Sequence, residues 1–264
     1  MKVNQTALLI PHFNNPEGLY SSIKSIHKSE NIDVVIVDDG STDNKFNELE
    51  LNDIFKSGTN VYYLYLDSNK GIEHALNYGL AFIKSKNYKY TARLDAGDLC
   101  EPNRFQIQEN FLENNTNIKL VGSGIIAIDE KGIELYRKEF PETHIELKRK
   151  MYLNCMFIHP TVMFANDVID AIGDYPTNFN AAEDYAFFFK ILNSFETANI
   201  KEPLVKIEIN HSGISIQKRK QQVASRIKII KKYFYFGFWP IYGLFRNYML
   251  YIIPNSFLLF LKKL

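Results

Sequence analysis

The sequence predicts an α/β fold in which a mostly parallel sheet is flanked by helices. In the first hundred residues, short apolar runs alternate with segments of helical periodicity, which is typical of βαβ units. Most of the runs end in a cluster of polar residues, Pro or Gly, as strands do where they leave a sheet. The chain has 264 residues, 46% of them hydrophobic, which is enough to bury a sizeable core.

Each expected element follows from its own pattern. Strands are indicated by β-branched or apolar runs, and helices by apolar residues at spacings of three and four. The strands expected in the first half are residues 7–10, 33–37, 61–66 and 88–94, with helices over 19–26, 46–55 and 71–84. In the second half, residues 121–128, 161–164 and 204–209 are expected as strands and residues 183–192 as a helix.

The composition excludes several classes of protein. The hydrophobic content and 23% charged residues do not fit a collagen-like, low-complexity or disordered chain. The two cysteines, Cys100 and Cys155, lie far apart, which argues against a disulfide scaffold and favours a reducing compartment. The first apolar run is too short for a signal peptide, and no apolar stretch is long enough for a spanning helix, so we expect a cytoplasmic protein.

Charge divides the chain in two. Ten Lys and Arg lie in residues 218–264 without one Asp or Glu, which leaves 21 basic and 30 acidic residues in the rest. We therefore expect a domain over residues 1–216 and a basic, aromatic, helical extension over 217–264. The extension fits a helix lying on an anionic membrane surface, with Trp239, Tyr242, Tyr248 and Tyr251 at headgroup level and breaks at Pro240 and Pro254.

Two other interpretations of the extension compete with membrane contact. It is also consistent with a helical lobe whose aromatic residues pack on the domain. Nucleic acid is disfavoured as a partner because too many aliphatic residues stand among the basic ones.

Polar residues gather where the predicted strands end, at the edge where ligands bind in parallel α/β sheets. Asp95 and Asp98 could hold a hard divalent cation, Mn²⁺ or Mg²⁺, or form an ordinary acidic turn around Gly97. Asp39 could bind a nucleotide base or belong to a capped turn, and Lys70 could meet a phosphate at a helix start or be solvated.

Further candidates lie in the strand before the acidic turn and in the second half. Arg93 would be costly to bury unpaired, so it pairs with a carboxylate or reaches the ligand, and pairing is favoured. Glu183 and Asp184 open a helix, either as a general base or as a complement to the helix dipole. His159 and His211 are single histidines, which are more often structural than ligating.

Taken in order, these pieces resemble the family 2 glycosyltransferases of the GT-A fold. The matching segments are residues 10–14 (IPHFN), 36–43 (IVDDGSTD), 69–71 (NKG), 93–98 (RLDAGD), 159–164 (HPTVMF) and 182–185 (AEDY). Each segment is weak alone, whereas the ordered set is specific and covers residues 5 to about 215. The resemblance implies a GT-A fold, Rossmann-like, and transfer of a sugar from a nucleotide donor, most often a UDP-sugar.

The resemblance also implies roles for individual residues. Pro11, His12, Phe13 and Asp39 would line the pocket for base and ribose, with Lys70 and Arg93 near the nucleotide. Asp95 would bind ribose and, with Asp98 and His211, the metal on the diphosphate. Asp184 would be the base, with Glu183 beside it. Two departures stand out, because the family usually has Asp where Gly97 stands and a small residue where His12 stands.

These roles predict an inverting glycosyltransferase. A base on the acceptor hydroxyl and a cation on the leaving diphosphate suffice for displacement at the anomeric carbon. The extension suggests a lipid-linked glycan acceptor at the inner face of the cell membrane, as in synthesis of O-antigen, capsule or lipopolysaccharide. The alternatives are a sugar-nucleotide nucleotidyltransferase, although no Gly-rich phosphate loop follows the first strand, and an inactive peripheral membrane protein with a vestigial site.

Overall fold

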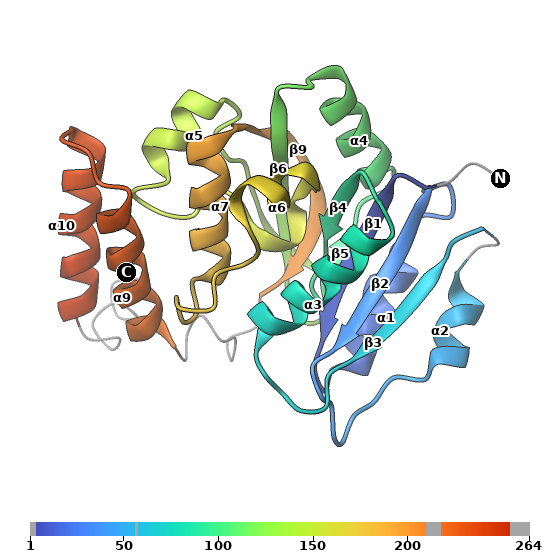
Figure 1. Cartoon of the computed structure of the whole chain (residues 1–264). Coiled ribbons are helices and arrows are strands. Elements are labelled where there is room, and N and C mark those ends of the chain that lie inside the picture. Colours follow the sequence, from blue (N-terminus) through green and yellow to red (C-terminus); the bar gives the residue numbers. More distant parts are fainter. Residues whose placement is uncertain (1–3, 56–57, 210–217, 254–264) are drawn as a thin grey trace.

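The computed structural model describes residues 4–55, 58–209 and 218–253 and shows a single curled sheet with helices on both faces (Figure 1). The strands are β1 (Thr6–His12), β2 (Ile32–Asp38), β3 (Val61–Tyr65), β4 (Tyr90–Arg93), β5 (Leu99–Cys100), β6 (Ile118–Ile128), β7 (Glu134–Lys138), β8 (Met163–Ala165) and β9 (Glu196–Glu208). The helices are α1 (Pro16–Lys24), α2 (Glu48–Ile54), α3 (Ile72–Ser85), α4 (Arg104–Asn114), α5 (His144–Lys150), the 3₁₀ turn η1 (His159–Thr161), α6 (Asp167–Ile172), α7 (Glu183–Ser194), α9 (Arg219–Lys232) and α10 (Phe238–Ile252).

The sheet has the order β3-β2-β1-β4-β8-β6-β9-β5, and β7 pairs with β6. Its first half is parallel, as the sequence predicts, because β1 pairs with β2 and β4 and β2 pairs with β3 in that sense. The second half is mixed: β6 and β9 are parallel, whereas β8, β5 and β7 run antiparallel to their neighbours. The carboxyl ends of β1, β2 and β4 therefore meet at one edge.

Alternation along the buried strands builds two cores. Leu8 and Ile10 of β1 face the core formed with α1, α2 and α4, while Ala7 and Leu9 face the core formed with α3, α6 and α7. This is the period of two expected of a strand covered on both faces. The chain thus forms the three-layer α/β arrangement that its sequence predicts.

The part of the extension that the structure describes, residues 218–253, contains the helices α9 and α10, and α9 shares the main core. Ile229 and Ile230 of α9 are fully buried in the core that contains α7, and Tyr233 stacks on Phe189 with ring centroids 5.3 Å apart. The lobe interpretation is therefore right for α9. The predicted boundary at residues 216 and 217 lies outside the described residues.

One expectation about the extension is wrong. Pro240 does not break a helix, because it lies in the first turn of α10, where its missing N–H group costs no hydrogen bond. The break instead comes between α9 and α10, at residues 233–237. Pro254 lies outside the described residues. Among those residues, no helix has the length and apolar character needed to cross a bilayer.

Candidate active site

The conformation of the acidic turn after β4, residues 95–98, is fixed by side chains of α1 and of the residue that caps it. Gly97 has φ = +115°, a left-handed conformation that Asp adopts only with strain, which accounts for Gly in place of the family's usual Asp. Ser22 accepts a hydrogen bond from Gly97 N at 2.9 Å and donates one to Asp95 O at 3.2 Å. Asn15 donates to Ala96 O at 3.2 Å. The turn is therefore a fixed structure rather than a solvated loop.

Arg93 lies beneath this turn and orients Asp95. The guanidinium has no exposed surface and donates from Nη2 to Asp95 Oδ1 at 2.6 Å. It also donates to the carbonyl of Leu9 and, at 3.4 Å, to His159 Nε2, which contacts Tyr175 OH at 3.0 Å. Burial, with help from the charge of Arg93, holds the pKa of His159 well below its usual range. The predicted pairing of Arg93 with a carboxylate is confirmed, and its predicted contact with the nucleotide stays a prediction.

Asp98 and Asp95 together fit a divalent cation bound with a diphosphate. Asp98 is 8% exposed and accepts from Glu208 N at 3.3 Å, whereas the Asp95 side chain is 37% exposed. Burial and then the charge of Asp95 raise the pKa of Asp98, and a divalent cation would offset both effects. Mg²⁺ commonly takes one or two carboxylates and fills its shell with phosphates and water. No cluster of three or more ligating side chains occurs within the described ranges, and His211 lies outside them.

His12 supports the loop after β1. Its Nε2 accepts from Asn15 N at 3.1 Å and its Nδ1 lies 3.1 Å from Asp38 Oδ2, so the neutral ring donates to Asp38. Burial lowers the pKa of His12, which keeps the ring neutral. Both nitrogens are occupied, so the ring has no polar atom left for a nucleotide. The neighbouring Phe13 is 45% exposed and Pro11 is half-buried, at the mouth of the same edge.

Asp39 joins the end of β2 to the start of α3. Its two carboxylate oxygens accept from Lys70 N at 2.8 Å and Gly71 N at 2.9 Å, while the Lys70 side chain is exposed. Burial raises the pKa of Asp39. Gly40 beside it has φ = +70°, and a Cβ there would lie 2.3 Å from the Ser68 backbone. This junction places a carboxylate and a lysine at the edge where the resemblance implies base and ribose.

Glu183 and Asp184 lie in the first turn of α7. Their surroundings affect the pKa values of the two side chains differently. Burial and the neighbouring Asp184 raise the pKa of Glu183 to about 8. Burial also raises the pKa of Asp184, but Tyr185 N donates to its Oδ1 at 2.7 Å and the positive charge of Arg226 opposes the shift. When the pKa values of two neighbouring acids differ in this way, one can keep its proton while the other acts as a base. Asp184 thus has a backbone donor and a nearby positive charge, both of which favour its ionised form.

The turn at residues 95–98 and the start of α7 face the same site. The charge of Asp95 acts on both Glu183 and Asp184 through space, although the three belong to different parts of the fold. The structure therefore brings the two acidic groups that the sequence predicts close enough for their charges to interact.

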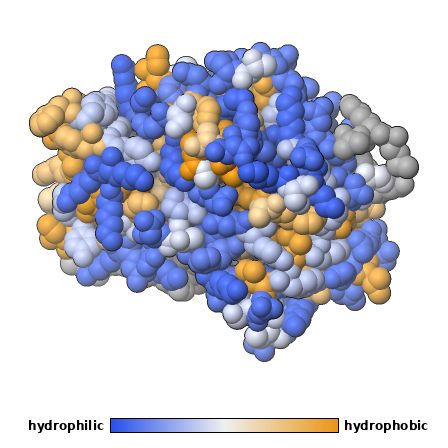
Figure 2. Space-filling model, in the orientation of Figure 1, coloured by the Kyte–Doolittle hydropathy of each residue, from blue (hydrophilic) through white to orange (hydrophobic). Residues whose placement is uncertain are grey.

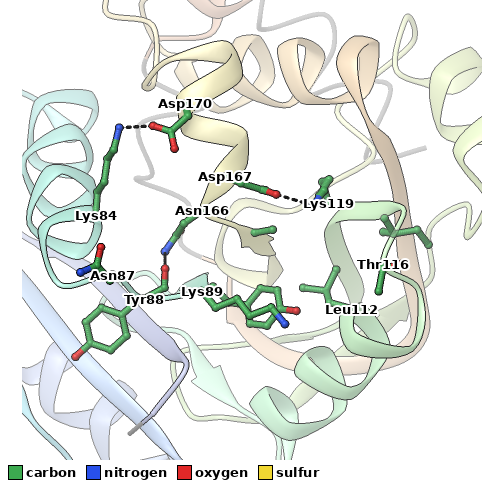
Figure 3. Close-up of a pocket in the computed structure, with 13 residues that line it drawn as sticks. Lys84, Asn87, Tyr88, Lys89, Leu112, Thr116, Lys119, Asn166, Asp167 and Asp170 are labelled. Carbon is green, nitrogen blue, oxygen red and sulfur yellow. Dashed lines mark hydrogen bonds and ion pairs between the residues drawn. The ribbon is translucent and has the colours of Figure 1, made fainter.

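A cavity of about 570 Å³ lies elsewhere, at the opposite edge of the sheet (Figure 3). Its lysines are neutralised: Lys119 pairs with Asp167 at 2.6 Å, and Lys84 pairs with Asp170. It contains none of the predicted site residues. The candidate active site is therefore identified by its carboxylates and their contacts, and not by this cavity.

Sequence reasoning missed several residues of this site. Ser22 and Asn15 fix the acidic turn, but nothing in the motif distinguishes them from ordinary helix-start residues. Arg226 was counted among the membrane-facing basic residues. Its position between Val223 and Ile227, on the buried side of α9, is the signal that could have found it.

Comparisons with known proteins agree with this geometry. Residues 7–173 match the sequence family described as glycosyl transferase family 2. The chain belongs to this family. The match spans well over half of the chain and includes β1, β2, the acidic turn and η1. The protein is therefore a glycosyltransferase, which excludes the nucleotidyltransferase alternative.

Similar proteins act in the synthesis of bacterial surface polysaccharides. The chain is 26% identical over 230 residues to the amylovoran biosynthesis glycosyltransferase AmsE of Erwinia amylovora, covering 85% of this chain and 84% of that one. It is 32% identical to the O-antigen biosynthesis glycosyltransferase WbnJ of Escherichia coli over 54% of this chain and 55% of that one.

Solved structures share the GT-A fold. S. aureus TarS in complex with UDP-GlcNAc superposes with a TM-score of 0.63 at 16% identity, covering 86% of this chain and 66% of that one. The mannosyltransferase PcManGT from Pyrobaculum calidifontis, in complex with GDP-Man and Mn²⁺, gives a TM-score of 0.61 at 14% identity over 96% and 71% of the two chains. The expected fold class is confirmed.

Proposed function

We propose that this glycosyltransferase transfers a sugar from a UDP-sugar to a glycan hydroxyl with inversion, using Asp184 as base. The observation that carries the proposal is the position of Asp184 in the first turn of α7, where Tyr185 N donates to its carboxylate and the charge of Asp95 on the acidic turn acts on it. A single base suffices for direct displacement, because the acceptor oxygen attacks the anomeric carbon as the bond to the diphosphate breaks. Bound UDP-GlcNAc in TarS supports a UDP-sugar as donor.

In this reaction the described side chains bind, orient and move a proton. Asp184 takes the proton of the attacking hydroxyl. Asp39 and the exposed Phe13 lie where a base and ribose would bind, and Arg93 keeps Asp95 turned toward the diphosphate. A Mn²⁺ or Mg²⁺ held by Asp95 and Asp98 would supply charge neutralisation for the leaving diphosphate. The Mn²⁺ in PcManGT supports this choice of metal.

Thermal unfolding with nucleotides tests the donor site. UDP, GDP, dTDP and CMP are each added with Mn²⁺ and with EDTA. A nucleotide at 100 times its dissociation constant stabilises by about 2.7 kcal/mol, a clear rise in melting temperature. We expect a rise with UDP and Mn²⁺ that EDTA abolishes and that Asp95→Asn weakens. A rise with GDP alone would overturn the choice of donor, and no rise with any nucleotide would favour the vestigial alternative.

The same proposal includes a lipid-linked acceptor at the inner face of the cell membrane, because α10 presents an apolar stripe to solvent. Its exposed residues recur at helical spacing: Phe238, Ile241, Tyr242, Phe245, Tyr248, Met249 and Ile252. Figure 2 shows this orange surface at the left side of the molecule, where Figure 1 draws α10. Lys228, Lys231 and Lys232 of α9 are exposed nearby, and residues 218–253 contain no acid. An apolar face flanked by cations fits an anionic bilayer surface.

Point variants test this contact better than truncation, because α9 belongs to the core. We expect Phe238→Ser with Phe245→Ser to release the protein from liposomes that contain anionic lipid. Ile133→Ser with Leu135→Ser removes equally exposed apolar residues from the β6–β7 hairpin and is the matched control. If both double variants bind as the wild type does, α10 is not the docking surface.

A further inference from the structure

Arg226 is an unusual basic residue because it is half-buried. It belongs to α9, and its guanidinium carbon is 5.6 Å from the centre of the Tyr185 ring. Its Nε is buried and, within the described part of the chain, has no hydrogen-bond partner. A partly buried cation without hydrogen bonds is costly unless an opposite charge lies close by. The arginine therefore requires a counter-charge.

The packing of α9 fixes where this cation lies. Ser225 Oγ donates to Asn180 O at 2.9 Å, in the loop that leads into α7. Just after the end of α9, Tyr233 O accepts from Tyr152 OH at 2.6 Å, and the Tyr233 ring stacks on Phe189 of α7. These contacts lie on both sides of Arg226 in the sequence and hold α9 against α7, beside each other in Figure 1. The guanidinium is thus held at the first turn of α7.

The acid at that position is Asp184. Residues 218–253 contain no Asp or Glu, so α9 and α10 offer Arg226 no partner of their own. The charge of Arg226 acts on Asp184 and on the Cys155 thiol, while Arg246 of α10 donates to Leu153 O at 2.7 Å. Arg246 donates to that carbonyl, whereas Nε of Arg226 has no hydrogen-bond partner among the described residues.

We infer that Arg226 is a positioning residue of this glycosyltransferase, supplying across the α7–α9 interface the counter-charge that keeps Asp184 ready to accept a proton. The inference rests on the proposed role of Asp184 and extends the active site into the segment beyond residue 217. The groups that face Asp184 are Glu183 on its own helix, Asp95 on the acidic turn, Arg226, and the neutral Cys155, Tyr175 and Tyr185. Arg226 is the cation among these groups.

A double-mutant cycle on the full chain tests the pair without a substrate. Melting temperatures are measured for the wild type, Arg226→Met, Asp184→Asn and the double variant, at pH 8. We expect Arg226→Met to lower the melting temperature by about 3 °C or more, and by less than half as much when Asp184 is already Asn. Losses that simply add would show that Arg226 only packs on Tyr185, which would overturn the inference.

Two further readouts separate positioning from packing. Lys228→Met removes an exposed cation of the same helix and is the matched control, with no coupling to Asp184→Asn expected. With UDP-sugar, the acidic limb of the rate–pH profile is expected to move to higher pH in Arg226→Met, and Arg226→Lys to restore it in part. An unmoved limb would contradict the inference. If the wild type turns over no UDP-sugar, the proposed function fails, and the melting cycle still decides whether Arg226 and Asp184 are coupled.

Discussion

The guanidinium of Arg93 donates a hydrogen bond to the carboxylate of Asp95 across 2.6 Å, from a position with no exposed surface. Asp95 is the half-exposed member of the pair, so the buried cation orients a carboxylate that solvent and ligand can reach. The acidic turn therefore depends on a residue inside the strand before it.

Arg93→Met is expected to destabilise the fold strongly. The variant loses the hydrogen bonds that the buried guanidinium donates to Asp95 and to the carbonyl of Leu9, and hydrogen bonds that involve a charged group contribute about 1.5–3 kcal/mol each. Thermal unfolding should show a fall of roughly 10 °C. Lys84→Met breaks the ion pair with Asp170 at the exposed edge and should leave the melting temperature nearly unchanged. Similar losses in the two variants would contradict the assigned importance of burial.

Asp184→Asn and Glu183→Gln are expected to differ in activity. Loss of a general base lowers the rate by about 10²–10⁴-fold. Glu183 has a pKa of about 8 and is mostly protonated at pH 7, so its amide replacement should cost less than about tenfold. Initial rates of UDP release at saturating donor measure both. Equal losses would mean that the two acids act as one unit.

The raised pKa of Glu183 also predicts how stability depends on pH. A carboxyl group whose pKa is higher in the folded state contributes most below its unfolded value, near 4.5, and that contribution is lost as pH rises through about 8. Glu183→Gln should therefore melt above the wild type at pH 9 and close to it at pH 5. A difference in melting temperature that is independent of pH would show that Glu183 is not held protonated.

Gly40→Ala is expected to weaken nucleotide binding. Alanine at a positive φ costs about 1 kcal/mol, and here its Cβ would also collide with the Ser68 backbone, moving the loop that Asp39 holds. Gly132 also has a positive φ, +77°, but an added Cβ there would have no atom within 4 Å, so Gly132→Ala is the matched control. UDP affinity should fall at least about tenfold in Gly40→Ala and remain unchanged in Gly132→Ala. Equal affinities would remove this junction from the site.

The sequence predicts the parallel half of the sheet well because β1, β2 and β4 are buried on both faces. Such strands are continuous apolar runs, and β1 and β2 begin and end within a residue or two of the expected positions. β7 was missed because every one of its residues is exposed. The first part of β9 was missed because its start, at Glu196, follows α7 directly without a turn signal. Tertiary pairing with β6 defines both strands.

The sequence predicts the candidate-site residues that belong to a recognisable motif. It does not predict those that only tertiary packing brings to the site. Asp95 and Asp184 were found because each belongs to a short segment with its own pattern. The role inferred for Arg226 was not predictable, because it depends on the packing of α9 on Tyr185 of α7, and composition alone assigns a cation in a basic tail to the surface. The inward position of His12, with both ring nitrogens occupied, likewise depends on Asp38 and Asn15.

The short strand β5 follows the acidic turn at once and pairs with β9, at the far end of the sheet order from β1 and β2. The strand that follows the turn thus pairs with a segment that is translated about a hundred residues later. A nascent chain that has not yet produced residue 208 has β4 but nothing for β5 to join, and Asp98 lacks the backbone donor of Glu208. Because such long-range pairing forms late in folding, the growing chain completes this acidic turn only after the residues of β9 have been made.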